Sequence, residues 1–92
     1  MSDIIFKAIA DKNRRKILQL LKEHGSLTAG ELAEHFDFSK ASLSEHLKNL
    51  RMAGLIYATK KGQYIHYRIN TSIFEEILAW VVSLYNKSEE SS

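Results

Sequence analysis

The chain has 92 residues, of which 45% are hydrophobic, and this size and composition suit a single folded domain. It contains no cysteine, which excludes disulfides, thiolate metal sites and a cysteine nucleophile. The formal net charge is only +2, so the placement of charge carries more information than its sum. No apolar run approaches the roughly 20 residues that cross a bilayer, and the first residues lack the pattern of a secretory signal, so we expect a cytoplasmic protein.

The first third of the chain shows three helical patterns with recognisable ends. Residues 3–10 form a short apolar helix in this prediction. Asp11 is expected to cap a second helix, which Gly25 closes. Thr28 and Glu31 have the spacing of a capping box, which predicts the start of a third helix that extends to about Phe36.

A fourth helix and a β-hairpin follow. Ser39 is expected to cap this helix, which ends near Ala53 and buries the side formed by Leu43, Leu47 and Leu50. The segments "LIYATKK" and "QYIHYRI" are rich in β-branched and aromatic residues, and Gly62 lies in the short turn between them. These features predict a hairpin with its turn at Gly62.

The last predicted helix begins at Thr71 or Ser72 and reaches about Lys87. Its apolar residues form two neighbouring stripes, and one domain of this size needs only one of them for its core. We expect the other stripe to bind a second copy of the chain; the alternative is that both are buried within one chain. We expect one domain over residues 1–88 and a flexible tail over residues 89–92.

Positive charge is concentrated between Phe38 and Asn70, where six basic residues face a single acid, Glu45, for a net charge of +5. A short turn joins the fourth helix to the third, as in a helix-turn-helix whose second helix enters the DNA major groove. Its outward side carries small, hydroxyl and charged residues that can contact bases. The base-reading residues we predict are Lys40, Ala41, Ser42, Ser44, Glu45 and Lys48.

If the fourth helix is considered alone, its outward side is best interpreted as an ordinary solvent-exposed surface. The hairpin favours DNA binding instead, because Lys60 and Lys61 lie near its tip, where they are free to contact phosphate. A basic helix followed by a basic hairpin is the arrangement of a winged helix.

The chain resembles the ArsR-type winged-helix repressors from Phe6 to Tyr85. "IADKNRRKILQLL" resembles the opening of that family, "LTAGELAEHFDFSKASLSEHLKNLRMAGLI" its helix-turn-helix, and "KKGQYIHYRI" its wing. The resemblance implies a mainly α (α+β) winged helix-turn-helix fold, with four helices, a two-stranded hairpin and a fifth helix. It also implies dimerisation through the first and last helices.

The resemblance also implies roles for individual residues. Gln63 stands where many members have a wing arginine, so the neighbouring lysines take over that contact in this prediction. The expected phosphate contacts are Arg14, Ser39, Lys60, Lys61 and Gln63. The expected dimer interface comprises Ile4, Ile5, Ile9, Ile73, Ile77, Trp80, Val81 and Leu84.

Many relatives sense metals through cysteine pairs or through ligands on the last helix. Here cysteine is absent, and the four histidines show no i, i+4 pair, so we expect neither an intrinsic metal site nor a cofactor. Derepression is then expected to come from a partner protein that sequesters the repressor. A membrane-associated antirepressor is the candidate that the resemblance suggests, and it would recruit the repressor to the membrane.

The function we predict is sequence-specific repression of transcription by a homodimer on a palindromic operator of its own promoter. The alternative is a winged-helix module for protein–protein interaction, but such a module need not keep an exposed basic surface. An enzyme is not expected, because the chain has no phosphate-binding glycine-rich loop and no supported nucleophile, base and acid set. No small-molecule substrate is evident either.

Overall fold

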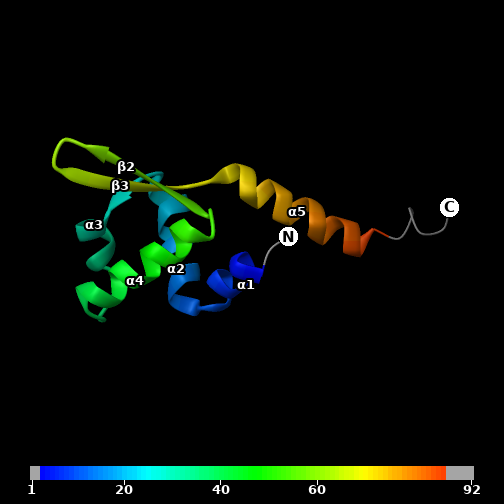
Figure 1. The fold of residues 1–92 in the computed structure, drawn as a ribbon, viewed down its shortest axis with the longest axis horizontal. Coiled ribbons are helices and arrows are strands. Elements are labelled where there is room, and N and C mark those ends of the chain that lie inside the picture. Colours follow the sequence, from blue (N-terminus) through cyan, green and yellow to red (C-terminus); the bar gives the residue numbers. More distant parts are fainter. Residues whose placement is uncertain (1–2, 87–92) are drawn as a thin grey trace.

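The computed structural model describes residues 3–86. The expected tail over residues 89–92 and the expected helix end near Lys87 lie outside this range. The elements in chain order are α1 (Asp3–Ala10), α2 (Lys12–His24), β1 (Leu27–Thr28), α3 (Ala29–Ala33), α4 (Lys40–Met52), β2 (Ile56–Lys61), β3 (Tyr64–Ile69) and α5 (Thr71–Tyr85). The predicted order of helices and hairpin is confirmed (Figure 1), and β1 is an additional strand.

The ends of α2 are fixed by the residues that the sequence indicates. The Asp11 carboxylate accepts hydrogen bonds from the backbone N–H groups of Asn13 at 2.8 Å and Arg14 at 3.1 Å. At the other end Gly25 has φ 82° and donates its N–H to the Leu21 carbonyl at 2.8 Å. Glycine adopts this left-handed conformation without steric cost, so the chain turns sharply after α2.

The predicted caps of α3 and α4 are also confirmed. Thr28 Oγ1 accepts the Glu31 N–H at 3.2 Å, and the Glu31 carboxylate accepts the Thr28 N–H at 2.8 Å, which completes the capping box. Ser39 Oγ accepts the Ser42 N–H at 3.1 Å at the start of α4. These caps supply partners for N–H groups that a helix cannot satisfy itself, and so they set where α4 begins.

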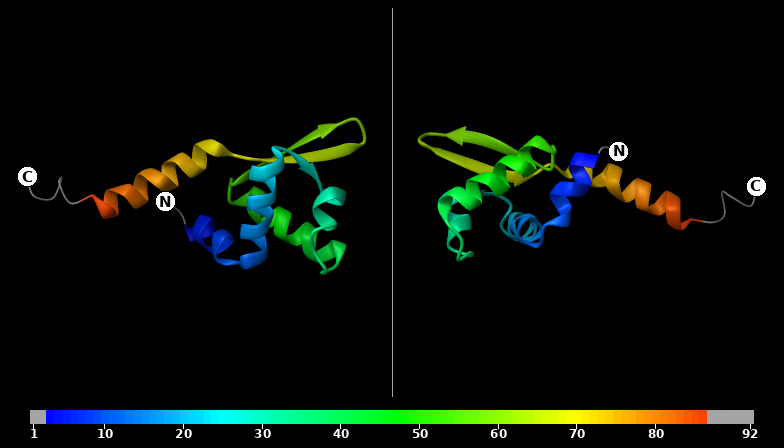
Figure 2. Two further views of the ribbon diagram at one scale, coloured as in Figure 1. Left: turned by 180° about the vertical axis from the view of Figure 1, so that it is seen from behind. Right: turned by 60° about the horizontal axis from the view of Figure 1, so that its bottom comes forward.

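The sheet has three antiparallel strands in the order β1-β3-β2. Strand β1 pairs Leu27 with Tyr67, and β2 pairs Ile56 with Ile69 at the base of the hairpin. Leu27, Ile56 and Tyr67 are buried, so this face of the sheet covers the helical core, and the opposite face is open to solvent. The hairpin of β2 and β3, called the wing below, extends beyond the helices (Figures 1 and 2).

The core lies where α2, α3 and α4 meet the base of the sheet. Its fully buried large side chains are Ile17, Leu21, Leu32, Leu50 and Leu55. Ile5 of α1 also belongs to this core, with only 6% of its surface exposed. The prediction that Ile5 forms part of a dimer interface is therefore corrected, because its side chain is already used within one chain.

Helix α5 leaves the body of the molecule and points away from the wing (Figure 1). Ile73, Phe74 and Ile77 in its first half pack against the core, yet no residue of α5 is buried. Farther along, the Trp80 ring contacts the Phe6 ring of α1 at a centroid distance of 5.3 Å. Only the start of α5 thus covers the core of its own chain, less than the full stripe that the sequence predicts.

Candidate nucleic-acid interface

The wing and the N-terminal end of α4 lie on the same side of the molecule (left in Figure 1). The α1 N-terminus and most of α5 lie at the opposite end, and both further views agree (Figure 2). The two basic elements can therefore face one surface together, while the exposed part of α5 faces elsewhere.

The outward face of α4 is accessible over its whole length. Among the predicted base-reading residues only Ser42 is partly buried; those exposed are Lys40, Ala41, Ser44, Glu45 and Lys48. The Ser42 hydroxyl lies 3.1 Å from the Ser39 hydroxyl, next to the cap. The structure thus brings these side chains together at one helix face, where lysines, hydroxyls and one carboxylate could meet base edges or phosphates.

Aromatic rings under the turn between α3 and α4 set the direction of α4. The Phe36 and Phe38 rings stack at 4.6 Å, and the Phe38 ring lies 5.2 Å from the His46 ring of α4. On the other side, Lys16 Nζ lies 4.8 Å above the Phe36 ring and donates to the His35 carbonyl at 2.9 Å. These contacts connect α2, the turn and α4, and rigid positioning of this kind is what base readout needs.

Arg14 makes contacts within the chain that the sequence did not indicate. Its Nε donates to the Ala8 carbonyl at 2.8 Å, and one terminal nitrogen donates to the Lys7 carbonyl at 3.1 Å. The other terminal nitrogen lies 3.4 Å from His46 Nδ1. All three guanidinium nitrogens have intramolecular contacts, so Arg14 links the end of α1 to α4, and its phosphate contact stays a prediction.

Asp11 contributes to the same polar cluster. Burial raises the pKa of Asp11, but the backbone N–H groups of Arg14 and Asn13 lower it, as do the positive charges of Arg14 and His46. The net result is a pKa below 3.8, the ordinary value for the residue. The carboxylate is thus held in the charged form that caps α2.

The wing lysines are exposed at the far end of β2. Lys61 pairs with Tyr64 across the turn, and Lys60 pairs with Ile65, so the two lysines point to opposite faces of the hairpin. Gly62 at the turn has φ 63°, and Gln63 beside it is exposed. Both lysines and the glutamine are free to reach an external group, as the prediction requires.

The residues of the expected dimer interface divide into two groups. Ile5 is buried in the core of its own chain, and Ile9, Ile73 and Ile77 are partly buried against that core. The remaining four keep large exposed areas: Ile4 44%, Trp80 42%, Val81 47% and Leu84 64%. Single-chain burial therefore leaves the second half of α5, with Ile4 nearby, as the apolar surface without a partner among the described residues.

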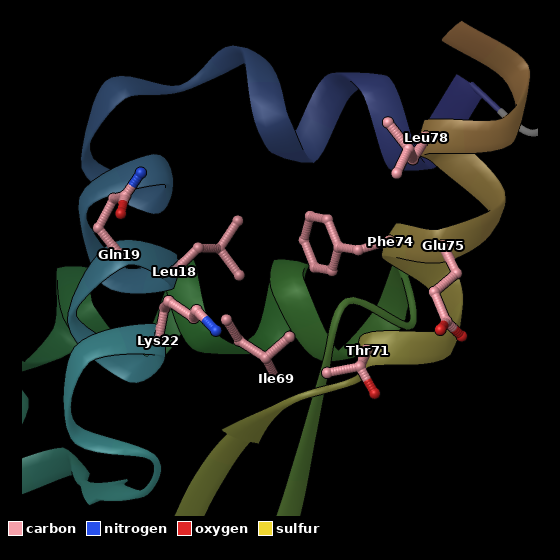
Figure 3. Close-up of a pocket in the computed structure, with 8 residues that line it drawn as sticks. All are labelled: Leu18, Gln19, Lys22, Ile69, Thr71, Phe74, Glu75 and Leu78. Atoms are coloured by element: carbon pink, nitrogen blue, oxygen red, sulfur yellow. The ribbon is translucent and has the colours of Figure 1, made fainter. Parts of the chain in front are cut away.

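A cavity of about 390 Å³ separates α2 from the start of α5 (Figure 3). Leu18 of α2, Ile69 of β3 and Phe74 of α5 point into it, while Lys22 and Glu75 lie at its polar edge. The space explains why α5 is anchored by few side chains, since α2 and α5 are not in close contact here.

Within residues 3–86, no three His, Cys, Asp or Glu side chains gather as metal ligands would. In the same range, no helix is both long and apolar enough to span a membrane.

Comparisons with known proteins agree with this geometry. The family model described as "Bacterial regulatory protein, arsR family" matches residues 11–58, which are 48 of the 92 residues. The chain is 47% identical over 85 residues to the transcriptional repressor SdpR of Bacillus subtilis (strain 168), covering 92% of this chain and 93% of SdpR. It is 34% identical over 84 residues to the arsenical resistance operon repressor of Escherichia coli (strain K12), covering 91% and 68%.

A solved structure shows the same fold. The crystal structure of an ArsR family transcriptional regulator is similar with a TM-score of 0.81 and 32% identity, over 90% of this chain and 84% of that one. The region that matches the family model runs from the cap of α2 through α4 to the first residues of β2, so it includes α4 but only the start of the wing. The chain therefore belongs to the arsR family of bacterial regulatory proteins and is a DNA-binding transcriptional repressor.

Proposed function

We propose that the chain represses transcription as a homodimer bound to a palindromic operator. The observation that carries this proposal is the division of the molecule: α4 and the wing share one side, and the exposed apolar half of α5 lies at the other end. A twofold contact through α5 and α1 would place two copies of α4 about 34 Å apart, which is one turn of B-form DNA.

In this dimer, α4 reads bases through the side chains of its outward face, and the wing lysines contact backbone phosphate. Base contacts give sequence preference, whereas phosphate contacts give affinity without preference. We further propose that the operator lies in the promoter of the repressor's own gene, which is the role that the family resemblance implies.

Fluorescence anisotropy with a duplex from the upstream region of this gene tests the proposal. Several phosphate contacts per dimer should weaken binding by about 10³-fold or more between 50 and 200 mM salt, because counterions are released on binding. A scrambled duplex of the same length serves as the control. Affinity that hardly changes with salt, or that is equal for both duplexes, would contradict sequence-specific operator binding.

We also propose that no intrinsic metal site controls this repressor. The chain has no cysteine, and the described residues offer no group of three suitable ligands. Added zinc, compared with a chelator, should leave operator affinity unchanged within error. A tenfold or greater loss of affinity with zinc would contradict this part of the proposal.

In place of a metal, we propose that a partner protein sequesters the repressor. The exposed end of α5, where Tyr85 is 85% and Leu78 is 62% exposed, supports an additional apolar contact. An antirepressor in the membrane would then move the repressor from DNA to that membrane. Cell fractionation under inducing conditions tests this: the repressor should sediment with membranes, and a repressor that remains in the soluble fraction while its operator is derepressed would contradict it.

A further inference from the structure

The outer face of the sheet carries a polar hollow that operator binding through α4 does not use. Strand pairing places Thr59 opposite His66, and Tyr57 opposite Arg68. Alternate residues of a strand point to the same face, so these four side chains share one face of the wing. Tyr67, on the other face, is buried in the core, which identifies the face of the hollow as the one open to solvent.

The hollow has a volume of about 260 Å³ and is lined by Ser26, Thr59, Lys61, His66 and Arg68. Each lining side chain can donate a hydrogen bond, since the set comprises two hydroxyls, an ammonium, an imidazole and a guanidinium. No carboxylate lines it. The charge of His66 helps to lower the pKa of Glu31, but the Glu31 carboxylate already accepts the Thr28 N–H at 2.8 Å.

Arg68 is held in place without using its hydrogen-bond donors. Its guanidinium carbon lies 5.2 Å from the centroid of the Tyr57 ring, which orients the side chain along the sheet. Within the described part of the chain, the Arg68 guanidinium makes no hydrogen bond. The planar guanidinium therefore has a fixed position and, within that part of the chain, N–H donors without acceptors. Two such donors in parallel match two oxygens of one anion.

We propose that this hollow binds a phosphate group. Arg68 contacts two phosphate oxygens, Lys61 supplies a second positive charge, and the hydroxyls with His66 complete the coordination. The phosphate comes either from the DNA backbone beside the operator or from a free phosphate ester, and the recognising chemistry is the same. Because Lys61 lies at the wing tip as well as in the hollow, the DNA source would be continuous with the proposed interface.

The first experiment uses the free protein. Inorganic phosphate is titrated while amide NMR shifts are recorded, and we expect saturable shifts at Ser26, Thr59 and His66. Arg68→Ala should weaken the apparent affinity by about tenfold, the usual scale for loss of a charge-assisted pair. Arg51→Ala is the matched control: it removes one exposed arginine from the end of α4, outside the hollow, and should leave the phosphate affinity unchanged.

The second experiment uses duplexes of two lengths, the operator alone and the operator with flanking base pairs. If the phosphate belongs to DNA, Arg68→Ala weakens binding of the longer duplex by about tenfold and leaves the shorter one unaffected. If the ligand is a free phosphate ester, the variant loses phosphate binding but keeps wild-type affinity for both duplexes.

Two results would overturn the proposal. One is an Arg68→Ala variant that behaves as wild type in the phosphate titration and with both duplexes. The other is an equal loss of phosphate affinity in Arg51→Ala, which would show that only the overall charge of the protein matters. The duplex experiment rests on the proposed function, whereas the phosphate titration does not, so failure of operator binding leaves the test of the hollow intact.

Discussion

In the proposed complex, single side chains on the outward face of α4 would decide between affinity and sequence preference. Glu45 is exposed there among lysines, and its charge repels phosphate while its oxygens can accept from cytosine N4. An acid in this position weakens general DNA binding, so a favourable role for it requires contact with a base.

We predict that Glu45→Ala lowers the ratio of affinities for operator and scrambled duplexes, by about 1–3 kcal/mol of discrimination, because one base contact is lost. Anisotropy titrations with both duplexes measure this ratio. Lys61→Ala is the control, since loss of a phosphate contact should weaken both duplexes alike. Equal changes on both duplexes for Glu45→Ala would show that the carboxylate reads no base.

At the same scale, Asp11 links the stability of α2 to pH. Its pKa is lower in the folded chain than the ordinary 3.8, so the charged form stabilises the fold. This contribution is fully present above the unfolded pKa and is lost as the pH falls through the lowered folded pKa. Asp11→Ala should cost about 1 kcal/mol near neutral pH, the usual value of an N-cap, and much less once the pH lies below the lowered folded pKa.

Urea denaturation of the wild type and Asp11→Ala at both pH values measures the difference. Asp37→Ala, which removes an exposed carboxylate from a turn, is the control and should change little at either pH. A penalty for Asp11→Ala that persists at low pH would rule out the charged cap as its cause.

The hydrogen bonds of single side chains also show which contacts a sequence can predict. The caps at Asp11, Thr28 and Ser39 were predictable because donor and acceptor are two or three residues apart. The role of Arg14 was not, because its partners Ala8 and His46 lie 6 and 32 residues away along the chain. A basic residue before an apolar helix has the same local pattern whether it binds phosphate or a carbonyl.

Among the elements, α1 packs against α4 in the core, and the Arg14 guanidinium adds a polar link between them. Arg14→Ala would leave the Lys7 and Ala8 carbonyls at the end of α1 without their donor, so we predict a loss of about 1–3 kcal/mol in the free energy of unfolding. Arg14→Lys should recover only part of it, because an ammonium lacks the fork geometry that serves both carbonyls.

Hydrogen exchange distinguishes this link from a general loss of stability. We expect α1 amides to lose protection in Arg14→Ala before α2 amides do. Arg15→Ala provides a comparison, since the more exposed Arg15 side chain donates to the Ile9 and Ala10 carbonyls at the end of α1 and, among the described residues, has no hydrogen bond to α4. Uniform loss of protection over all helices would contradict a specific link to α1.

Strand β1 shows why local sequence patterns do not predict every secondary-structure element. β1 has two residues, and its existence depends on Leu27 pairing with Tyr67 some distance along the chain. Two residues give no periodicity, so only the capping box that follows was visible in the sequence. The predicted third helix also proved too long: α3 ends at Ala33, and the N–H groups of His35 and Phe36 then bond carbonyls only three residues back, in turns.

For the whole molecule, the excess of apolar surface on the last helix was predictable. Which part of that surface is buried against the core, and which part stays exposed, was not. The number of apolar positions exceeds what one core can bury, and this follows from composition. Which turns of α5 meet the core depends on where the chain leaves β3, which is a property of the tertiary fold. There, Asn70 donates its backbone N–H to the Leu55 carbonyl and its side-chain amide to the Gly54 carbonyl, and so fixes the start of α5.

If α5 forms the dimer contact, one charge on its exposed half should separate the copies without unfolding them. Leu84 is 64% exposed in the single chain, so Leu84→Glu should have little effect on folding but should place a carboxylate in the apolar contact. Sedimentation should then show a monomer. Ala79→Glu is the matched control, because residue 79 lies on the polar side of the helix, between Glu75 and Ser83, and should remain dimeric.

The same pair of variants connects assembly to DNA binding. A dimer gains affinity from two linked half-sites, whereas a monomer binds each half-site independently. Leu84→Glu should therefore lose about 10²-fold or more on the full palindrome while its affinity for a single half-site matches the wild type. Unchanged affinity for the full palindrome in a demonstrated monomer would show that α5 contributes nothing to operator recognition. An equal loss on the half-site would mean that the substitution damages the reading helix itself.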